Sequence, residues 1–158
     1  MYGRGTMKTL GKAEDKREIE GRLGKLQPGS ARRWGKMTAP QMVCHLCDSF
    51  RGPMGEKALP RAEGPYPRTL IKWMALYVPV RWAHGLRTMP EIDQQIGGTP
   101  PGEFESDVRE LRRLLERFTR EPRDFAWTPH PFFLDMPDWE WMRWGYLHMD
   151  HHFRQFGV

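Results

Sequence analysis

The chain has 158 residues, of which 39% are hydrophobic and 28% charged, and its formal net charge is +5. These proportions are typical of one globular domain that is long enough to bury a core without disulfides. Two cysteines, Cys44 and Cys47, are too few for the disulfide framework of a small secreted protein, and no apolar run predicts a signal peptide or a membrane span. We therefore expect a cytoplasmic protein that does not bind a membrane.

The positive charge is concentrated near the N-terminus. Residues 1–36 carry ten basic and four acidic side chains, a net charge of +6, whereas the rest of the chain is almost neutral. A basic stripe can contact nucleic acid, but the mixed signs favour a solvated first helix behind a flexible tail. No recognised nucleic-acid-binding motif is present, so we expect no nucleic-acid partner. We predict a flexible tail over residues 1–12 and a single domain over residues 13–158.

Two helices are predicted in the first third of the chain. The first covers residues 13–26 and has a short apolar stripe, formed by Ile19, Leu23 and Leu26. The second begins at Thr38, a good N-cap residue, and has Pro40 in its first turn, where a missing N–H costs nothing. It should end near residue 50, before a loop rich in proline and glycine.

The rest of the chain predicts one short helix and two long ones. The short helix covers residues 68–77, and residues 79–98 form a long connection of a kind that usually lines a site. A third long helix is predicted over residues 99–119 from its amphipathic stripe, and a fourth over residues 137–156, capped by Asp135. The predicted fold class is therefore all-α: a four-helix bundle with a crossover between the second and third long helices, plus one short extra helix.

The last helix carries the strongest chemical signal. His148 and His152 are four residues apart, so both imidazoles can reach a single ion from one face of the helix. Trp141, Gly145 and Gln155 share this face, and we expect Gly145 to leave space for a ligand. A histidine pair of this spacing alone does not decide between a metal site and a polar helix face.

The second helix supplies a third histidine. His45 lies on a seam with Met42 and Ser49 that should face the other helices. A single histidine on such a seam is more often a hydrogen-bonded core residue than a ligand. Three histidines on two facing helices favour a metal, which accepts their lone pairs. The sequence thus predicts a divalent metal bound by His45, His148 and His152.

Cys44 and Cys47 flank His45, but we do not expect them to bind the metal. Each is rotated by roughly 100° or more from His45 around the helix. No second CxxC pair completes a four-cysteine site, and both thiols lie too far inside the helix for its N-terminal dipole to activate them. Buried, unreactive thiols are the preferred interpretation.

These segments resemble the DinB-like superfamily. The segment WGKMTAPQMVCHL, which ends with His45 and Leu46, resembles the start of its second helix, and YLHMDHHFRQFG resembles its HxxxHxxQ signature. The segment His130-Pro131-Phe132-Phe133 is similar to an element of an uncharacterised branch. The resemblance runs from about residue 13 to the end, and it implies a helical bundle with a crossover and a three-histidine metal site at His45, His148 and His152.

The resemblance also implies a class of activity. Better-studied relatives are thiol-dependent transferases and isomerases that use low-molecular-weight thiols, while many others have no known activity. This chain departs from them by ending directly after the signature and by its middle rich in tryptophan and proline, which leaves the substrate class open.

Our first functional hypothesis is a metal-dependent, thiol-transferase-like enzyme with one open coordination position and no protein nucleophile. Zinc or nickel is the expected metal, with a low-molecular-weight thiol as cosubstrate and a small-molecule substrate as partner. Around the metal we expect Gln155 to orient a ligand, and the surrounding residues to be Gly145, Trp141, Trp144, His130 and Ser49, together with the 79–98 connection. The second hypothesis is a non-catalytic metal-binding or interaction bundle in which Gln155 or another side chain closes the site. A homodimer is compatible with either.

Overall fold

The computed structural model describes residues 7–65 and 67–158, which form five α-helices and one short 3-10 helix and contain no β-strand. The α-helices are α1 (Ala13–Leu23), α2 (Ala39–Arg51), α3 (Arg68–Tyr77), α4 (Phe104–Thr119) and α5 (Asp138–Gln155), and the 3-10 helix is η1 (Pro90–Ile92). This confirms the predicted all-α fold class. None of these helices is long and apolar enough to cross a membrane.

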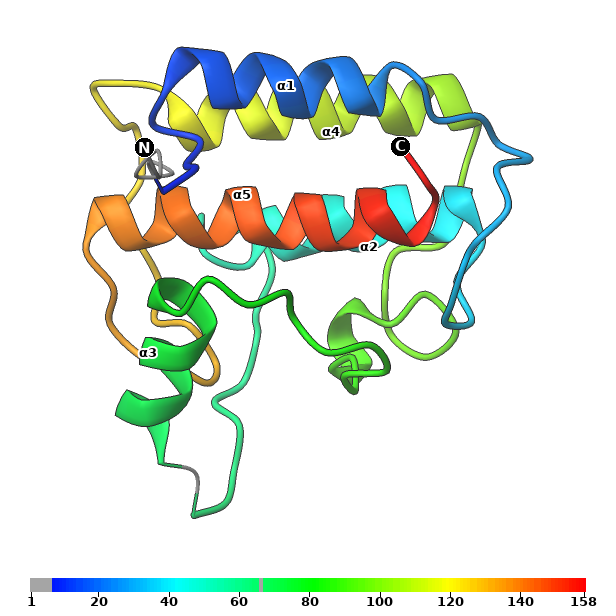
Figure 1. Ribbon diagram of the computed structural model, residues 1–158. Coiled ribbons are helices and arrows are strands. Elements are labelled where there is room, and N and C mark those ends of the chain that lie inside the picture. Colours follow the sequence, from blue (N-terminus) through cyan, green and yellow to red (C-terminus); the bar gives the residue numbers. More distant parts are fainter. Residues whose placement is uncertain (1–6, 66) are drawn as a thin grey trace, which may run out of the picture.

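Four long helices form the bundle, with α1 and α5 in front of α4 and α2 (Figure 1). Contacts between α1 and α5 advance in the same direction along both helices, since Tyr146 binds Glu18 and Asp150 binds Arg22. The same holds for α2 and α4, where Cys44 contacts Asp107 and Arg51 binds Glu110. These two neighbouring pairs are therefore parallel, which requires the long crossover that runs from α2 through α3 and η1 to α4.

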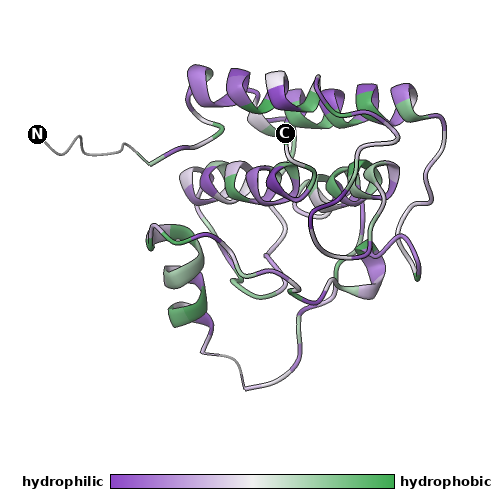
Figure 2. Cartoon of the chain, turned by 45° about the vertical axis from the view of Figure 1, so that its right-hand side comes forward, coloured by the Kyte–Doolittle hydropathy of each residue, from purple (hydrophilic) through white to green (hydrophobic). Residues whose placement is uncertain are grey.

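Apolar side chains from all four long helices form one core, and its large fully buried members include Trp141, Phe50, Phe118, Phe153, Ile19 and Leu111. The helix α3 stands outside this bundle and contacts the first half of α5 (Figure 1). In Figure 2 much of α3 is coloured as hydrophobic, and Leu70, Trp73 and Met74 on it are about half exposed.

The helix bounds agree with the sequence prediction except at three ends. The prediction began the third long helix at residue 99, whereas α4 begins at Phe104, where the Glu103 carboxylate accepts hydrogen bonds from two backbone N–H groups of the first turn. Thr99 instead binds Asp48 of α2. The first helix ends at Leu23 rather than residue 26, and α5 follows Pro137, with no side-chain cap from Asp135.

The predicted N-terminal tail lies partly outside the described residues, which begin at Met7. Within the described part, Leu10 is buried, and its backbone N–H donates to the Met142 carbonyl oxygen of α5. The side chain of Leu10 reaches the backbone of Gly145, one helical turn further along α5.

This contact overturns the expectation that Gly145 leaves space for a ligand. A Cβ atom at Gly145 would lie 2.7 Å from Leu10 Cδ1, 3.3 Å from Phe118 Cε1 and 3.4 Å from Phe50 Cε1. The missing side chain therefore makes room for the hydrophobic core and for the segment before α1. Sequence spacing had placed Gly145 near the histidine face, but it could not show that Leu10 fills the gap.

We predict that Gly145→Leu lowers the free energy of unfolding by about 1–3 kcal/mol or more, because extra atoms in a packed core force strain. Denaturant unfolding measures this change. Gly21→Ala in α1 is the matched control, since nothing lies within 4 Å of a Cβ there, and it should stabilise the protein by up to about 1 kcal/mol. A Gly145→Leu variant as stable as the parent would contradict the packing described here.

Candidate metal centre

The centre begins with His45, which is buried in the middle of α2. This helix starts with a capping box in which Thr38 and Gln41 bind each other's backbone N–H groups. The Nδ1 atom of His45 lies 2.8 Å from the Ile92 carbonyl oxygen of η1. Because a carbonyl oxygen only accepts, Nδ1 carries the proton and donates it to Ile92. The Nε2 lone pair of His45 is thereby left for an ion.

His152 is oriented in the same way from α5. Its Nδ1 atom lies 2.9 Å from Gln155 Oε1, and Gln155 Nε2 donates to the Trp34 carbonyl oxygen at 2.8 Å. The bond to Trp34 fixes which end of the amide faces His152, so Nδ1 of His152 is the protonated nitrogen. Gly35 makes this approach possible, because its φ is 79° and a Cβ there would lie 2.4 Å from Gln155 Nε2.

His148 completes the group. Its Nε2 atom lies 3.2 Å from His45 Nε2, and the ring centroid of His152 lies 4.7 Å from that of His45 and 5.0 Å from that of His148. One ring nitrogen from each of the three histidines lies within 4.8 Å of the others. The predicted convergence of two helices on one point is therefore present in the structure.

The donor set and its spacing fit a metal ion. Two nitrogens at 2.0–2.1 Å from an ion, at a tetrahedral angle, are about 3.3 Å apart, close to the observed His45–His148 separation. Backbone carbonyl and amide acceptors on the second ring nitrogen are typical of metal-binding histidines. Within the described residues no Cys, Asp or Glu joins the three histidines in this group, so the candidate ligand set consists of three imidazoles.

Burial lowers the pKa of His45, His148 and His152 below the ordinary histidine value, and mutual repulsion between the rings adds to the shift for His148 and His152. All three imidazoles are therefore neutral at pH 7, the state that binds a metal. Metal binding does not first have to remove protons from these rings at neutral pH.

Two loops cover the centre. Trp82, from the connection between α3 and η1, lies with its ring centroid 6.0 Å from that of His148 and 6.1 Å from that of His151. Trp34 contacts His151 edge-on and stacks on His84 at 3.8 Å between ring centroids. The expectation that the 79–98 connection reaches the site thus agrees with where these residues lie, whereas Trp34, His84 and Ile92 were not predicted as site residues.

Asp48 explains how the long connection is held in place. Its carboxylate is fully buried and accepts hydrogen bonds from the Thr99 N–H and hydroxyl, both at 2.7 Å, and from Gln94 Nε2 at 3.3 Å. Lys57 and Arg51 form ion pairs with the same carboxylate. Ile92, the last residue of η1, directly precedes the segment that contains Gln94. The hydrogen bonds to Asp48 therefore also hold the Ile92 carbonyl in position beside His45.

The other residues expected around the metal divide into two groups. Trp144 lies beside His148, with ring centroids 5.0 Å apart, and Gln155 binds His152 as described. Trp141 instead stacks on Trp127 in the core, and the Ser49 hydroxyl donates to the His45 carbonyl oxygen within α2. Their position on the inward face of a helix was right, but they serve packing and the local backbone.

His130 also has a local role. Its Nδ1 accepts hydrogen bonds from the backbone N–H groups of Phe132 and Phe133, both at 3.1 Å, and its ring stacks on that of Phe133. It is separated from the three histidines by Trp144, which contacts both His130 and His148. His130 therefore holds a turn next to the site.

Cys44 and Cys47 are free, buried thiols that point toward α4. Cys44 Sγ donates to Asp107 Oδ2 and Cys47 Sγ to the Asp107 carbonyl oxygen. Burial raises the pKa of Cys44 to about 12, and that of Cys47 is raised further for the same reason. Both thiols are protonated at neutral pH and turned away from the histidines, in agreement with the predicted inert role.

Comparison of the chain with protein-family models, with curated proteins and with solved structures gave no match.

We predict that Gln155→Ala lowers metal affinity by about 10- to 100-fold, because residues that orient a metal-binding histidine commonly have effects of this size. Competition with a chromophoric chelator measures the change. Gln27→Ala, at an exposed position, is the control and should bind metal as the parent does. Equal affinities for the Gln155→Ala variant and the parent would show that the amide does not orient His152.

A second prediction concerns acid stability. Burial lowers the pKa of His130 to about 3, while its value in the unfolded chain is about 6.5. As pH falls from 6.5 toward 3, the unfolded state binds a proton that the native state does not, so stability decreases by up to about 1.4 kcal/mol per pH unit. His130→Gln removes this titration and retains a neutral polar side chain.

Metal-stripped His130→Gln protein should therefore lose less stability than the metal-stripped parent between pH 6.5 and 4.5, measured by denaturant unfolding. The control is His84→Gln, since His84 is exposed. The same pH dependence in the His130→Gln variant and the parent would contradict the assigned protonation state of His130.

Proposed function

We propose that the chain is a metal-dependent enzyme in which His45, His148 and His152 hold one divalent transition metal. The observation that carries the proposal is the convergence of three neutral imidazoles, two of which have Nδ1 hydrogen-bonded so that the Nε2 lone pair is left for an ion. Zinc and nickel both suit imidazole ligands, and we propose one of these two. We also propose that the chain belongs to the DinB-like superfamily.

An open coordination position supports catalysis over a closed structural site. Structural zinc sites usually have four protein ligands, whereas catalytic sites have three and leave one position for water or substrate. Gln155, which was the candidate fourth ligand for a non-catalytic bundle, already accepts a hydrogen bond from His152 and donates one to Trp34. Its amide is thus engaged in orienting a ligand, which makes the non-catalytic alternative the weaker one.

A thiol-transferase-like reaction is the proposed chemistry. A divalent metal in this position supplies Lewis acidity that lowers the pKa of a thiol or water bound to it. The chain's own residues hold the ligand rings, and Trp82 and Trp144 border His148 and limit access of bulk water. The two inert cysteines leave the nucleophile to a low-molecular-weight thiol, and their reduced state suits the cytoplasm, where we propose that the protein acts on a small molecule.

The first test of the proposal is metal content. The purified parent should bind one equivalent of zinc or nickel, and His45→Ala, His148→Ala and His152→Ala should each lose most of it. Gln27→Ala, at an exposed position, and the double variant Cys44→Ala/Cys47→Ala should keep it. A Cys44→Ala/Cys47→Ala protein without metal would show that the ligand set is wrong.

The second test separates an enzyme from a closed site. Cobalt-substituted parent should give an absorption spectrum typical of four-coordinate cobalt that changes on titration with a low-molecular-weight thiol. No response to any thiol or small anion would show that the coordination sphere is closed, and would leave a non-catalytic metal site as the function.

A further inference from the structure

A cleft of about 160 Å³ lies on the side of α5 that faces away from the three-histidine group. The residues 143, 147, 150 and 154, which line it from α5, follow one another at helical spacing and point about 100° or more away from His148 around the helix axis. The opposite wall comes from the segment after α3. The lining residues include Arg81, Trp82, Arg143, Leu147, Asp150 and Arg154.

Positive charge dominates this cleft. Three guanidinium groups line it, while its single carboxylate, Asp150, is already shared: Oδ1 accepts from Arg22 at 2.7 Å and Oδ2 accepts from Arg154 at 2.9 Å. Asp150 therefore has little capacity left to neutralise the other two arginines, and the cleft carries a net positive charge.

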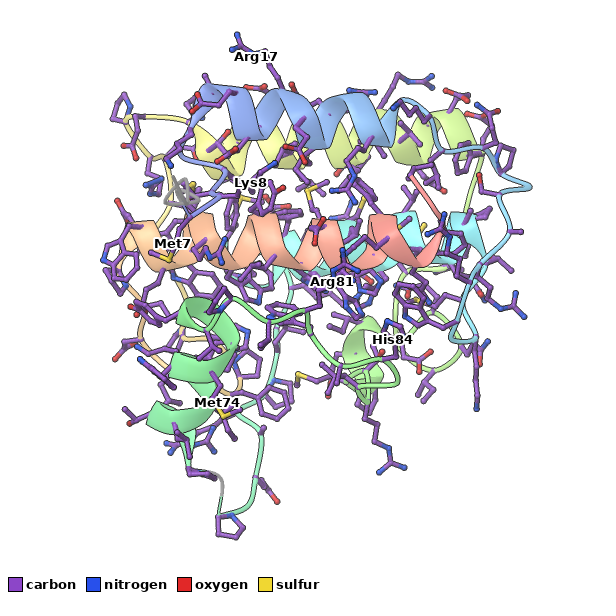
Figure 3. The ribbon with its side chains drawn as sticks, in the orientation of Figure 1. Met7, Lys8, Arg17, Met74, Arg81 and His84 are labelled. Atoms are coloured by element: carbon purple, nitrogen blue, oxygen red, sulfur yellow. The ribbon has the colours of Figure 1, made fainter. Side chains whose placement is uncertain are left out.

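Neither Arg143 nor Arg81 forms an ion pair with a described carboxylate, although Asp15 and Asp150 lie near enough to Arg143 to favour its charged form. Arg143 is half-buried, and its guanidinium donates to the carbonyl oxygens of Leu76 at 3.1 Å and Lys8 at 2.7 Å, which fix its position without compensating its charge. Burial lowers the pKa of Arg143 below its ordinary value, although the group stays charged at neutral pH. Arg81 is exposed beside the C-terminal half of α5 (Figure 3) and forms no ion pair within the described chain.

The size and shape of the cleft match a small charged group. A volume of about 160 Å³ is that of about five water molecules, which is less than a whole drug-sized ligand needs. It is sufficient for one carboxylate or phosphate group with its nearest atoms. Guanidinium groups bind such groups through paired N–H donors, and the Trp82 ring and Leu147 add an apolar wall.

We infer that this cleft binds a carboxylate or phosphate group of a small soluble molecule, with Arg81, Arg143 and Arg154 as donors. The inference goes beyond the proposed function, because it involves none of the histidines and requires no metal. Trp82 forms a wall of the cleft and also lies beside His148, so the bound anion sits next to the metal centre on the other side of one indole ring.

Calorimetric titration of the full chain with inorganic phosphate and with malonate, at constant ionic strength, tests the inference. We expect saturable binding of one anion per chain in the metal-stripped protein, where no metal can hold the anion. Arg81→Gln should weaken this binding by about tenfold, since a hydrogen bond to a charged group contributes at least that factor. The exposed position of Arg81 makes a folding defect in this variant unexpected, and a thermal melt checks it.

Arg17→Gln is the matched control. It makes the same change of net charge on α1, where Arg17 points away from the bundle into solvent (Figure 3), and it should bind the anions as the parent does. Equal weakening by Arg17→Gln and Arg81→Gln would indicate general screening and would overturn the inference.

Two further outcomes would also overturn it. Phosphate binding that disappears when the metal is removed would place the anion on the metal rather than in the cleft. Binding to vesicles of phosphatidylglycerol but not of phosphatidylcholine, without any heat from free phosphate or malonate, would assign the cleft to a lipid surface instead of a soluble anion. Saturable binding without metal that Arg81→Gln weakens and Arg17→Gln does not would support the inference.

Discussion

The burial of three facing imidazoles is the constraint on which the centre depends. Imidazole nitrogens taken out of water need partners, and the chain provides them for one nitrogen of His45 and one of His152: the Ile92 carbonyl and the Gln155 amide. The Nε2 atom of His45 lies 3.2 Å from that of His148, and one ring nitrogen from each of the three histidines lies within 4.8 Å of the others. A metal ion at this point would accept all three lone pairs at once, which is why the donor set fits one.

Two loops outside the helices hold the groups that accept these hydrogen bonds. The Ile92 carbonyl reaches His45 because Asp48, buried on α2, anchors Gln94 and Thr99 from the end of the long connection. Gln155 is oriented by the Trp34 carbonyl from the loop before α2, and Gly35 lets that loop approach closely. The hydrogen bond to Nδ1 of His45 therefore depends on one loop, and the hydrogen bond to Nδ1 of His152 depends on another. The orientation of both rings thus depends on segments far from them in the sequence.

The face of α5 opposite the histidines has a different character. The inward face carries neutral rings whose pKa values burial keeps low. The outward face carries Arg143 and Arg154 beside Asp150, which binds Arg154 and also Arg22 of α1. Trp82 touches both environments, because it borders the arginine cleft and packs beside His148. The helix α5 therefore has the candidate metal ligands His148 and His152 on one side and the arginines of the cleft on the other, with Trp82 beside both.

The sequence by itself determined the all-α class, the crossover and the three histidines, since helical periodicity and the spacing of His148 and His152 depend only on local geometry. It also placed the cysteines correctly, because rotation around α2 separates them from His45. Only the tertiary structure decided that Leu10 fills the space beside Gly145, that a backbone carbonyl at Ile92 orients His45, and that Trp141 belongs to the core. Those features depend on which distant segments meet, and a backbone carbonyl leaves no mark in the sequence, since every residue carries one.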